Sequence, residues 1–231
     1  MVPNKTTARV AGLVFLLMVL FGLFSEIFFR QKIFVAGNAA LTAGNILSNI
    51  SLYRVGITSD IAMSLCYLFT ALALYRLLVS VSKTLAQLMV LFAAAGCALL
   101  LSNILNELAP LSLLSASAQP GAFTAGQLQA MAMFSYDAYN HGYMIGQVFF
   151  ALWVLPLGVL IWRSRFIPKA FGILFIIEVV CGLLSVAVHF LVPNAMLENM
   201  LLLPGTIAEF AFLGWLLIRG TNEAKLTAQQ S

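Results

Sequence analysis

The stretch PKAFGILFIIEVVCGLLSVAVHFLV, residues 168–192, decides the fold class of this chain. It holds one lysine near its start, one glutamate near its middle and one histidine near its end, and almost all its other side chains are apolar. A helix needs about 20 apolar residues to cross the hydrocarbon core of a bilayer. The stretch therefore predicts a transmembrane helix that carries Glu178 close to mid-membrane.

Composition extends this prediction to the whole chain of 231 residues, of which 62% are hydrophobic and only 9% charged. A soluble domain carries about 25% charged residues, so a soluble protein and a nucleic-acid binder are excluded. We predict an all-α integral membrane bundle of six transmembrane helices forming one domain, residues 1–231. The expected spans are roughly 10–29, 56–78, 84–108, 139–162, 168–192 and 200–218.

The two long connections carry different patterns. In residues 30–55, apolar side chains recur at helical spacing, which predicts a short helix on the membrane surface between spans one and two. Residues 109–126 are rich in Ser, Ala, Pro and Gly and predict a loop. Thr124 and Gln127 fit a capping box, and a helix that begins there is expected to run directly into span four.

The basic residues predict the orientation, because cytoplasmic loops are enriched in Lys and Arg. Nine of them fall at the chain ends and in the even-numbered connections, and only Arg30, Lys32 and Arg54 fall on the other side. We therefore expect a multi-pass protein of the cell membrane with both termini in the cytoplasm. Most acidic residues fall at the opposite, outer ends of the spans.

Several membrane chemistries are excluded by counting. No lysine lies well inside a span, which excludes a retinal Schiff base, and the two histidines are too few for a three-histidine zinc site. The motifs H-E-x-x-H and G-x-S-x-G and a P-loop are absent. The three cysteines lie in apolar runs and indicate small buried side chains. We predict no cofactor.

The main candidate site lies at the outer ends of the spans, where Asp137 and His141 share one helix face at a spacing of four. A histidine beside a carboxylate serves as a general base, a proton relay or a metal ligand. His141, Asp137 and His189 are the metal candidates, and one haem between the two histidines is an alternative. The other outer candidates are Glu26, Arg54, Asp60 and Glu107. The alternative is a polar layer that holds the helix ends together and pairs with Arg54 or Arg30.

Glu178 and Glu209 form the second candidate site, since ionisable residues at mid-membrane depth are costly and mark function. They lie on consecutive antiparallel spans, where they could share a proton, and the alternative is that each forms one interhelical hydrogen bond. Pro204 and Gly205 precede Glu209 by about one turn. Arg54 and Asp60 form a candidate salt bridge at the start of span two.

An ordered set of short motifs covers nearly the whole chain: RVAGL (9–13), SEIFFR (25–30), LYRVGITSD (52–60), ALYRLL (73–78), HGYMIGQVFF (141–150), RSRFIPKAFG (163–172), LPGTIAE (203–209) and WLLIRG (215–220). In this set the chain resembles the bacterial membrane family catalogued as domain of unknown function 4386. The resemblance implies a multi-helix bundle in the cell membrane and no established activity. The matching positions are Arg54, Asp60, His141, Pro168, Pro204 and Glu209, whereas Asp137 and Glu178 lie outside the matching motifs.

The function expected from the residues is non-enzymatic: binding, sensing or transporting a small molecule, lipid or ion in a polar cavity that opens outward. One alternative is an intramembrane lipid-modifying or metal-dependent enzyme using His141 with a carboxylate partner. A second alternative is a structural or assembly partner of another membrane protein. The expected partners are the lipid bilayer, a small-molecule or lipid ligand and a second copy of the chain, and no nucleic acid. Gly142 and Gly146 have the spacing of either a contact between helices of one chain or a dimer seam.

Overall fold

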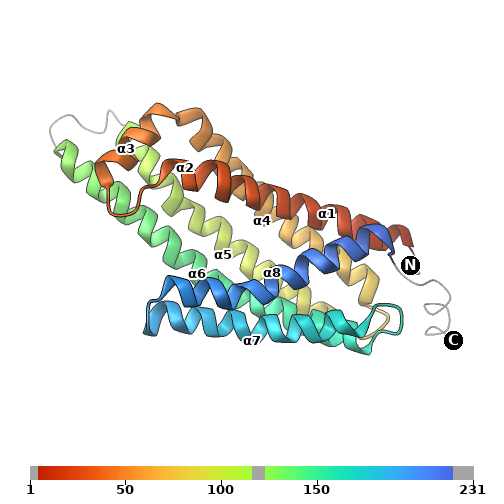
Figure 1. Cartoon of the computed structure of the whole chain (residues 1–231). Coiled ribbons are helices and arrows are strands. Elements are labelled where there is room, and N and C mark those ends of the chain that lie inside the picture. The colour runs from red at the N-terminus through yellow and green to blue at the C-terminus, as the bar shows by residue number, and fades with distance from the viewer. Residues whose placement is uncertain (1–4, 116–122, 221–231) are drawn as a thin grey trace. The chain divides into compact units, whose positions relative to one another are not determined.

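The computed structural model describes residues 5–115 and 123–220, and nearly all of them are helical (Figure 1). In chain order the elements are α1 (Lys5–Leu23), η1 (Phe24–Arg30), α2 (Gln31–Ile33), α3 (Ala39–Ser48), α4 (Ile50–Leu78), α5 (Lys83–Ser115), α6 (Ala125–Arg163), α7 (Lys169–Leu191) and α8 (Ala195–Ile218). Within the described ranges the chain has no β-strand.

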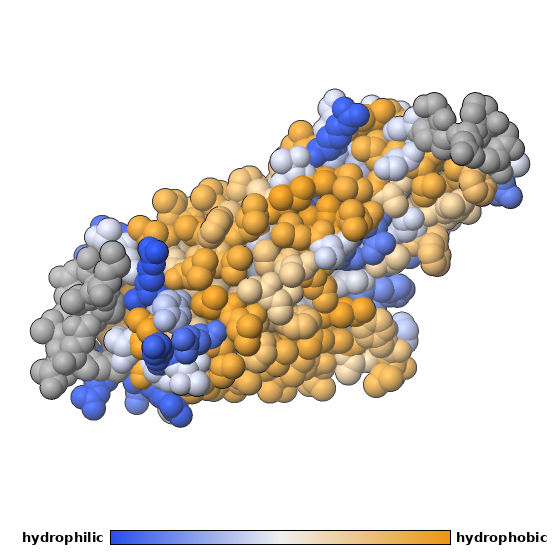
Figure 2. Space-filling model, turned by 180° about the vertical axis from the view of Figure 1, so that it is seen from behind, coloured by the Kyte–Doolittle hydropathy of each residue, from blue (hydrophilic) through white to orange (hydrophobic). Residues whose placement is uncertain are grey.

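Six helical segments are long and apolar enough to cross a membrane: the continuous run Lys5–Ile33 and the five helices α4 to α8. Large apolar side chains lie exposed along them, as Leu191 (79%) and Ile218 (76%) illustrate, and Figure 2 shows hydrophobic residues over most of the face in view. Such a surface suits lipid rather than water. The predicted all-α membrane bundle with a short helix between spans one and two is confirmed.

The helix starts follow local capping chemistry. At the start of α3, Asn38 Oδ1 accepts a hydrogen bond from the backbone N–H of Leu41 at 2.9 Å. At the start of α6, the backbone N–H of Thr124 donates to Gln127 Oε1, and the N–H of Gln127 donates to Thr124 Oγ1. This reciprocal pair is the capping box expected from the sequence. The helix that follows runs without a break for 39 residues, as predicted.

The loop prediction for residues 109–126 is wrong in its first part, because α5 continues through Pro110 to Ser115. Proline lacks an N–H and leaves one carbonyl of the preceding turn without its helical donor. The helix persists because its end packs: Leu111 belongs to a buried cluster with Phe29, Ile46 and Tyr53. The rest of the predicted loop falls partly on residues 116–122, which lie outside the described residues.

The chain divides into two compact units, which we describe separately. Unit 1 comprises the described residues of Met1–Leu17, Cys66–Cys97 and Met144–Ser231, and unit 2 comprises Met18–Leu65 and Ala98–Tyr143. The prediction of a single domain stays a prediction.

In unit 1, α7 and α8 lie side by side as an antiparallel pair (Figure 1). Phe175 of α7 packs edge-to-face on Phe212 of α8, with ring centroids 5.2 Å apart. Gly172 of α7 lies against Gly158 of α6 so closely that a Cβ added at Gly172 would lie 2.8 Å from the Gly158 carbonyl oxygen. Small residues thus allow close contact between these helices, as is common in membranes.

Candidate functional site

A π-helical turn begins the candidate site in unit 2. In η1, the residues Ser25, Phe29 and Arg30 are buried. Residues five apart align along a π-helix, whose hydrogen bonds run from i to i+5, so Ser25 and Arg30 face the same neighbour. Ser25 Oγ donates to the carbonyl of Gly56 at 3.2 Å, and Arg30 reaches Asp60 one turn further along α4.

Arg30 is the centre of a cluster of polar side chains that we call the Arg30 cluster, comprising Arg30, Asp60, Glu107, Tyr139 and the half-exposed Glu26. Its Nη1 donates to Asp60 Oδ2 at 2.8 Å, to Glu107 Oε1 at 3.0 Å and to the Tyr139 hydroxyl at 3.1 Å. Its Nε donates to Glu26 Oε2 at 3.0 Å. One guanidinium therefore connects η1, α4, α5 and α6.

The cluster is buried although its members are charged. The relative exposure is 9% for Arg30, 2% for Asp60 and 0% for Glu107. Charges inside a membrane protein are costly unless they are paired and hydrogen-bonded. Arg30 meets this condition, because its planar fork carries five N–H donors and Nη2 also lies 3.4 Å from Asp60 Oδ1.

Two glycines make room for the cluster. The ring of Phe29 lies over Gly56, where an added Cβ would overlap Cδ1 and Cγ of the ring. The side chain of Asn103 lies against Gly142 in the same way, and Asn103 Nδ2 donates to the carbonyl of Tyr139 at 2.9 Å. The first contact brings α4 close to η1, and the second brings α6 close to α5. Arg30 can therefore reach partners on all three helices.

Aromatic rings surround the cluster within unit 2. Phe34 stacks on Tyr136 with ring centroids 3.4 Å apart and an interplanar angle of 6°. Arg30 Cζ lies 5.5 Å from the ring centroid of Tyr139, within the range of a cation–π contact. The Tyr53 hydroxyl donates to the backbone carbonyl of Glu107 at 2.6 Å. These rings exclude lipid from the charged groups and hold Glu107 in place.

Among the residues that the structure describes, the Arg30 cluster has more negative than positive charge and contains one buried oxygen without a hydrogen-bond partner. With both carboxylates ionised, Asp60 and Glu107 carry two negative charges against the single positive charge of Arg30. In addition, Glu107 Oε2 is buried and has no hydrogen-bond partner within the described residues. Buried polar atoms are nearly always partnered, so each exception requires an explanation, such as a bound ion or water. The oxygen without a partner thus belongs to one of the two carboxylates that outnumber the single guanidinium.

The structure brings three of the predicted site residues together, since Glu26, Asp60 and Glu107 all contact Arg30. The expected pair between Arg54 and Asp60 is wrong. Asp60 pairs with Arg30, and Arg54 is exposed, because the π-helical turn directs Arg30 toward the buried face of α4.

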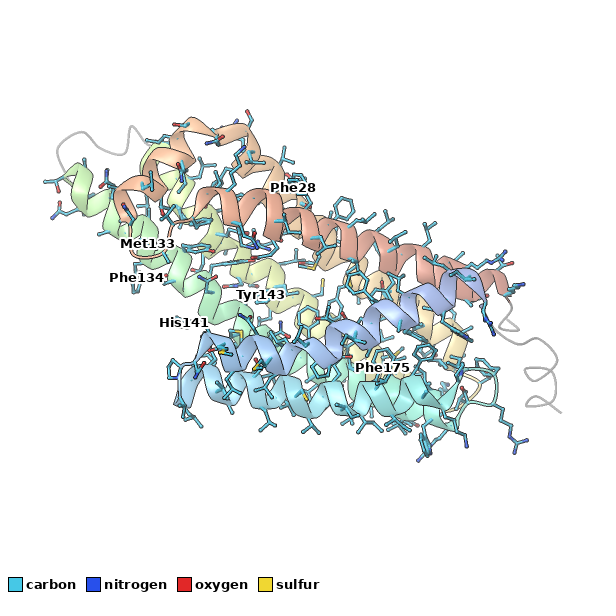
Figure 3. The ribbon with its side chains drawn as sticks, in the orientation of Figure 1. Phe28, Met133, Phe134, His141, Tyr143 and Phe175 are labelled. Carbon is cyan, nitrogen blue, oxygen red and sulfur yellow. The ribbon has the colours of Figure 1, made fainter. Side chains whose placement is uncertain are left out.

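Asp137 and His141 are exposed on α6, where Figure 3 labels His141. Among the residues that the structure describes, no group of three or more His, Cys, Asp or Glu side chains is placed to hold a metal ion. His189 lies in unit 1, where its Nδ1 is 3.0 Å from Glu198 Oε2.

Glu178 and Glu209 also lie in unit 1, on α7 and α8. Both are partly buried, and the two carboxyl groups are close enough to interact electrostatically. They are thus separate from the cluster of unit 2.

Sequence analysis named Arg30 only as an alternative partner of the polar layer, and it missed Tyr53 and Tyr139 as site residues. The spacing of four between Glu26 and Arg30 was a signal for Arg30, because oppositely charged residues at that spacing pair on a helix. The two tyrosines gave no such signal, since a tyrosine within an apolar span is equally typical of packing.

Six apolar helices of spanning length and a buried ionic cluster define the class: a multi-pass helical membrane protein. The chain belongs to the family described as Domain of unknown function (DUF4386), whose sequence profile matches residues 10–220. We found no curated protein and no solved structure that matches the chain.

Proposed function

We propose that this protein binds a small, positively charged hydrogen-bond donor at Glu107, as a transport or sensing protein of the membrane. The observation that carries the proposal is the unpartnered Glu107 Oε2, which lies buried in a cluster that has more carboxylates than cations. A donor with a positive charge satisfies both the free oxygen and the excess charge. A proton is the smallest such ligand, and an ammonium group is the next.

The charge balance argues against an anionic ligand. Arg30 is the cation that would attract an anion, and all three of its nitrogens already donate to carboxylates. An anion would have to displace Asp60 or Glu107 and leave a buried carboxylate unpaired, which costs about 3–5 kcal/mol. The proposal requires neither a metal ion nor a cofactor.

The distribution of basic residues supports an orientation with both termini in the cytoplasm of the cell. In that orientation the α1–α4 connection, with Arg30 at its start, faces the outside. A ligand would then enter from the outer side, through a polar cavity that opens there. The bilayer is the surrounding partner, and a lipid with a cationic headgroup belongs to the same ligand chemistry as a free amine.

The experiment uses methylammonium and the proton as probes. We would purify the wild type and Glu107→Gln in mild detergent and follow thermal unfolding against methylammonium chloride, with sodium chloride at equal ionic strength, and separately against pH. We expect methylammonium and acid to stabilise the wild type, and we expect Glu107→Gln to abolish the methylammonium response and to reduce the acid response. Arg54→Gln, an exposed arginine on α4, should keep both responses.

A purely structural cluster would behave differently. In that case Glu107→Gln would lower the unfolding temperature by the same amount under all conditions, and methylammonium would not stabilise the wild type. That outcome would refute ligand binding at Glu107 and favour an assembly role. A pH response that Glu107→Gln reduces, without a methylammonium response, would identify the proton as the ligand, and a response to methylammonium at constant pH would identify an amine.

A further inference from the structure

Buried polar atoms without a hydrogen-bond partner gather in unit 1. Within the described residues, four such side-chain atoms belong to this unit: Tyr67 Oη, Trp153 Nε1, Glu178 Oε2 and Ser185 Oγ. They come from α4, α6 and α7. Unpartnered buried polar atoms are rare, so each of these four requires an explanation.

Three of these atoms are connected through Glu209 and through ring contacts. Tyr67 packs against Trp153 at a centroid distance of 5.4 Å. The Tyr67 hydroxyl interacts electrostatically with Glu209 of α8, and Glu209 interacts with Glu178 of α7. A chain of polar groups thus runs from Trp153 and Tyr67 through Glu209 to Glu178. Ser185 lies two turns after Glu178, on the same face of α7.

Gly205 brings the two glutamates together. A Cβ added at Gly205 would lie 2.7 Å from Glu178 Cγ, so α8 approaches this side chain closely. Glu209 follows Gly205 by one helical turn, and residues four apart share a helix face. Glu209 therefore lies on the face of α8 that contacts Glu178.

Pro204 weakens the same turn of α8. It has no N–H to donate, so the carbonyl of Met200 loses its helical partner. Free carbonyls next to a broken turn form polar sites in membrane helices. Gly205 lies about one turn before Glu209, and the weakened turn lies directly before Gly205.

Among the described residues, no basic group is found to act on Glu178 or Glu209. The charged group that acts on Glu178, among the described residues, is Glu209, and the titratable groups that face the pair from neighbouring helices are Tyr67 of α4 and, next to Tyr67, Cys97 of α5. Two adjacent carboxyl groups that lack a cation hold a proton between them rather than ionising together.

We propose that Glu178 and Glu209 form a proton-exchange site in unit 1, in which the two carboxyl groups share one proton. The proton arrives from hydronium and leaves to water, so one O–H bond breaks as another forms. Both residues are only partly buried, so the pair is not fully enclosed by protein. The Tyr67 hydroxyl, which interacts electrostatically with Glu209, is a donor available to the site when it is ionised. This site is independent of the Arg30 cluster.

Infrared spectroscopy tests the proposal, because a protonated carboxyl group has a C=O stretching band that the ionised group lacks. We would record pH-difference spectra of the wild type and of Glu178→Gln/Glu209→Gln in nanodiscs. We expect the double variant to lose band area equal to one carboxyl group. Glu107→Gln and Glu198→Gln should retain that component, which separates this proposal from the binding site at Glu107.

Two results would overturn the shared proton. A loss equal to two carboxyl groups means that each glutamate holds its own proton, and no loss means that both are ionised. If the double variant does not fold, the single variant Glu209→Gln tests the proposal through the pH midpoint of the Glu178 band. Removal of the partner carboxyl should then move the midpoint of the Glu178 band by about one pH unit or more, a tenfold change in proton affinity, and an unchanged midpoint refutes the proposal.

Discussion

Nη1 of Arg30 lies 3.0 Å from Oε1 of Glu107, although 77 positions separate the two residues in the sequence. The same nitrogen lies 2.8 Å from Oδ2 of Asp60. One guanidinium thus joins the first span to the second and third. Because these charges are buried, each is stabilised only while its oppositely charged partner is present. Removal of one partner leaves the other buried and unpaired, which destabilises the fold.

Arg30→Gln should destabilise the protein strongly. The substitution leaves Asp60 and Glu107 buried without a cation, which costs about 3–5 kcal/mol. We expect a clear fall in the unfolding temperature in mild detergent, measured by the fraction that remains monodisperse after heating. Arg54→Gln is the control, since Arg54 is exposed on α4 and its loss should leave the unfolding temperature unchanged. Equal effects of the two substitutions would contradict the buried ion pairs.

Gly56→Ala should disrupt the packing that positions Arg30. The new methyl group would overlap the ring of Phe29, which is fully buried, and overpacking of this kind costs about 1–3 kcal/mol. Gly44→Ala is the matched control, because no atom lies within 4 Å of a Cβ at Gly44 in α3. Alanine is the better helix former by about 0.5–1 kcal/mol. The two variants should therefore shift the unfolding temperature in opposite directions.

Gly205→Ala tests the close approach of α8 to Glu178. The methyl group would lie 2.7 Å from Glu178 Cγ and force this side chain to move. We expect a lower unfolding temperature and a changed carboxyl band in the infrared spectrum. Gly214→Ala lies on the same helix and has open space around its Cβ, so it should not lower the unfolding temperature or change the carboxyl band. A Gly205→Ala variant as stable as Gly214→Ala would mean that the helices are further apart.

The orientation can be measured with two exposed turn residues. Ala36 lies in the turn between α2 and α3, and Ser80 lies in the turn between α4 and α5. With both termini in the cytoplasm, Ala36→Cys should react with a membrane-impermeant maleimide in intact cells, and Ser80→Cys should react only after permeabilisation. The reverse pattern would invert the topology and move the Arg30 cluster to the cytoplasmic side.

The sequence predicted the helices well because their signals are local. The capping box of Thr124 and Gln127 correctly predicted where α6 begins. The loop prediction after residue 108 failed because Pro110 suggested a break, whereas the packing of Leu111 in the cluster around Tyr53 keeps α5 helical. Tertiary contacts thus overrode a local preference.

The site was harder to predict than the helices, because its contacts join residues from four elements. The sequence indicated Glu26, Asp60 and Glu107 as polar residues near span ends, but it left their partner open between Arg54 and Arg30 and favoured Arg54 for Asp60. The choice of Arg30 depends on the π-helical turn at Phe24–Arg30, which rotates the end of the first span. No periodicity in the sequence indicates such a turn.

The sequence alone determined that this protein is a six-span membrane protein, because the length and apolarity of each span follow directly from the thickness and the low polarity of the bilayer. It also narrowed the chemistry to a few charged residues. Only the tertiary structure decided which of these meet. Arg30 reaches Asp60 and Glu107 because a wide helical turn aims it inward and Gly56 lets Phe29 and α4 approach. Within unit 1, Gly205 lets α8 approach the side chain of Glu178 closely. These contacts depend on close packing between segments that are far apart in the sequence, so local sequence patterns do not predict them.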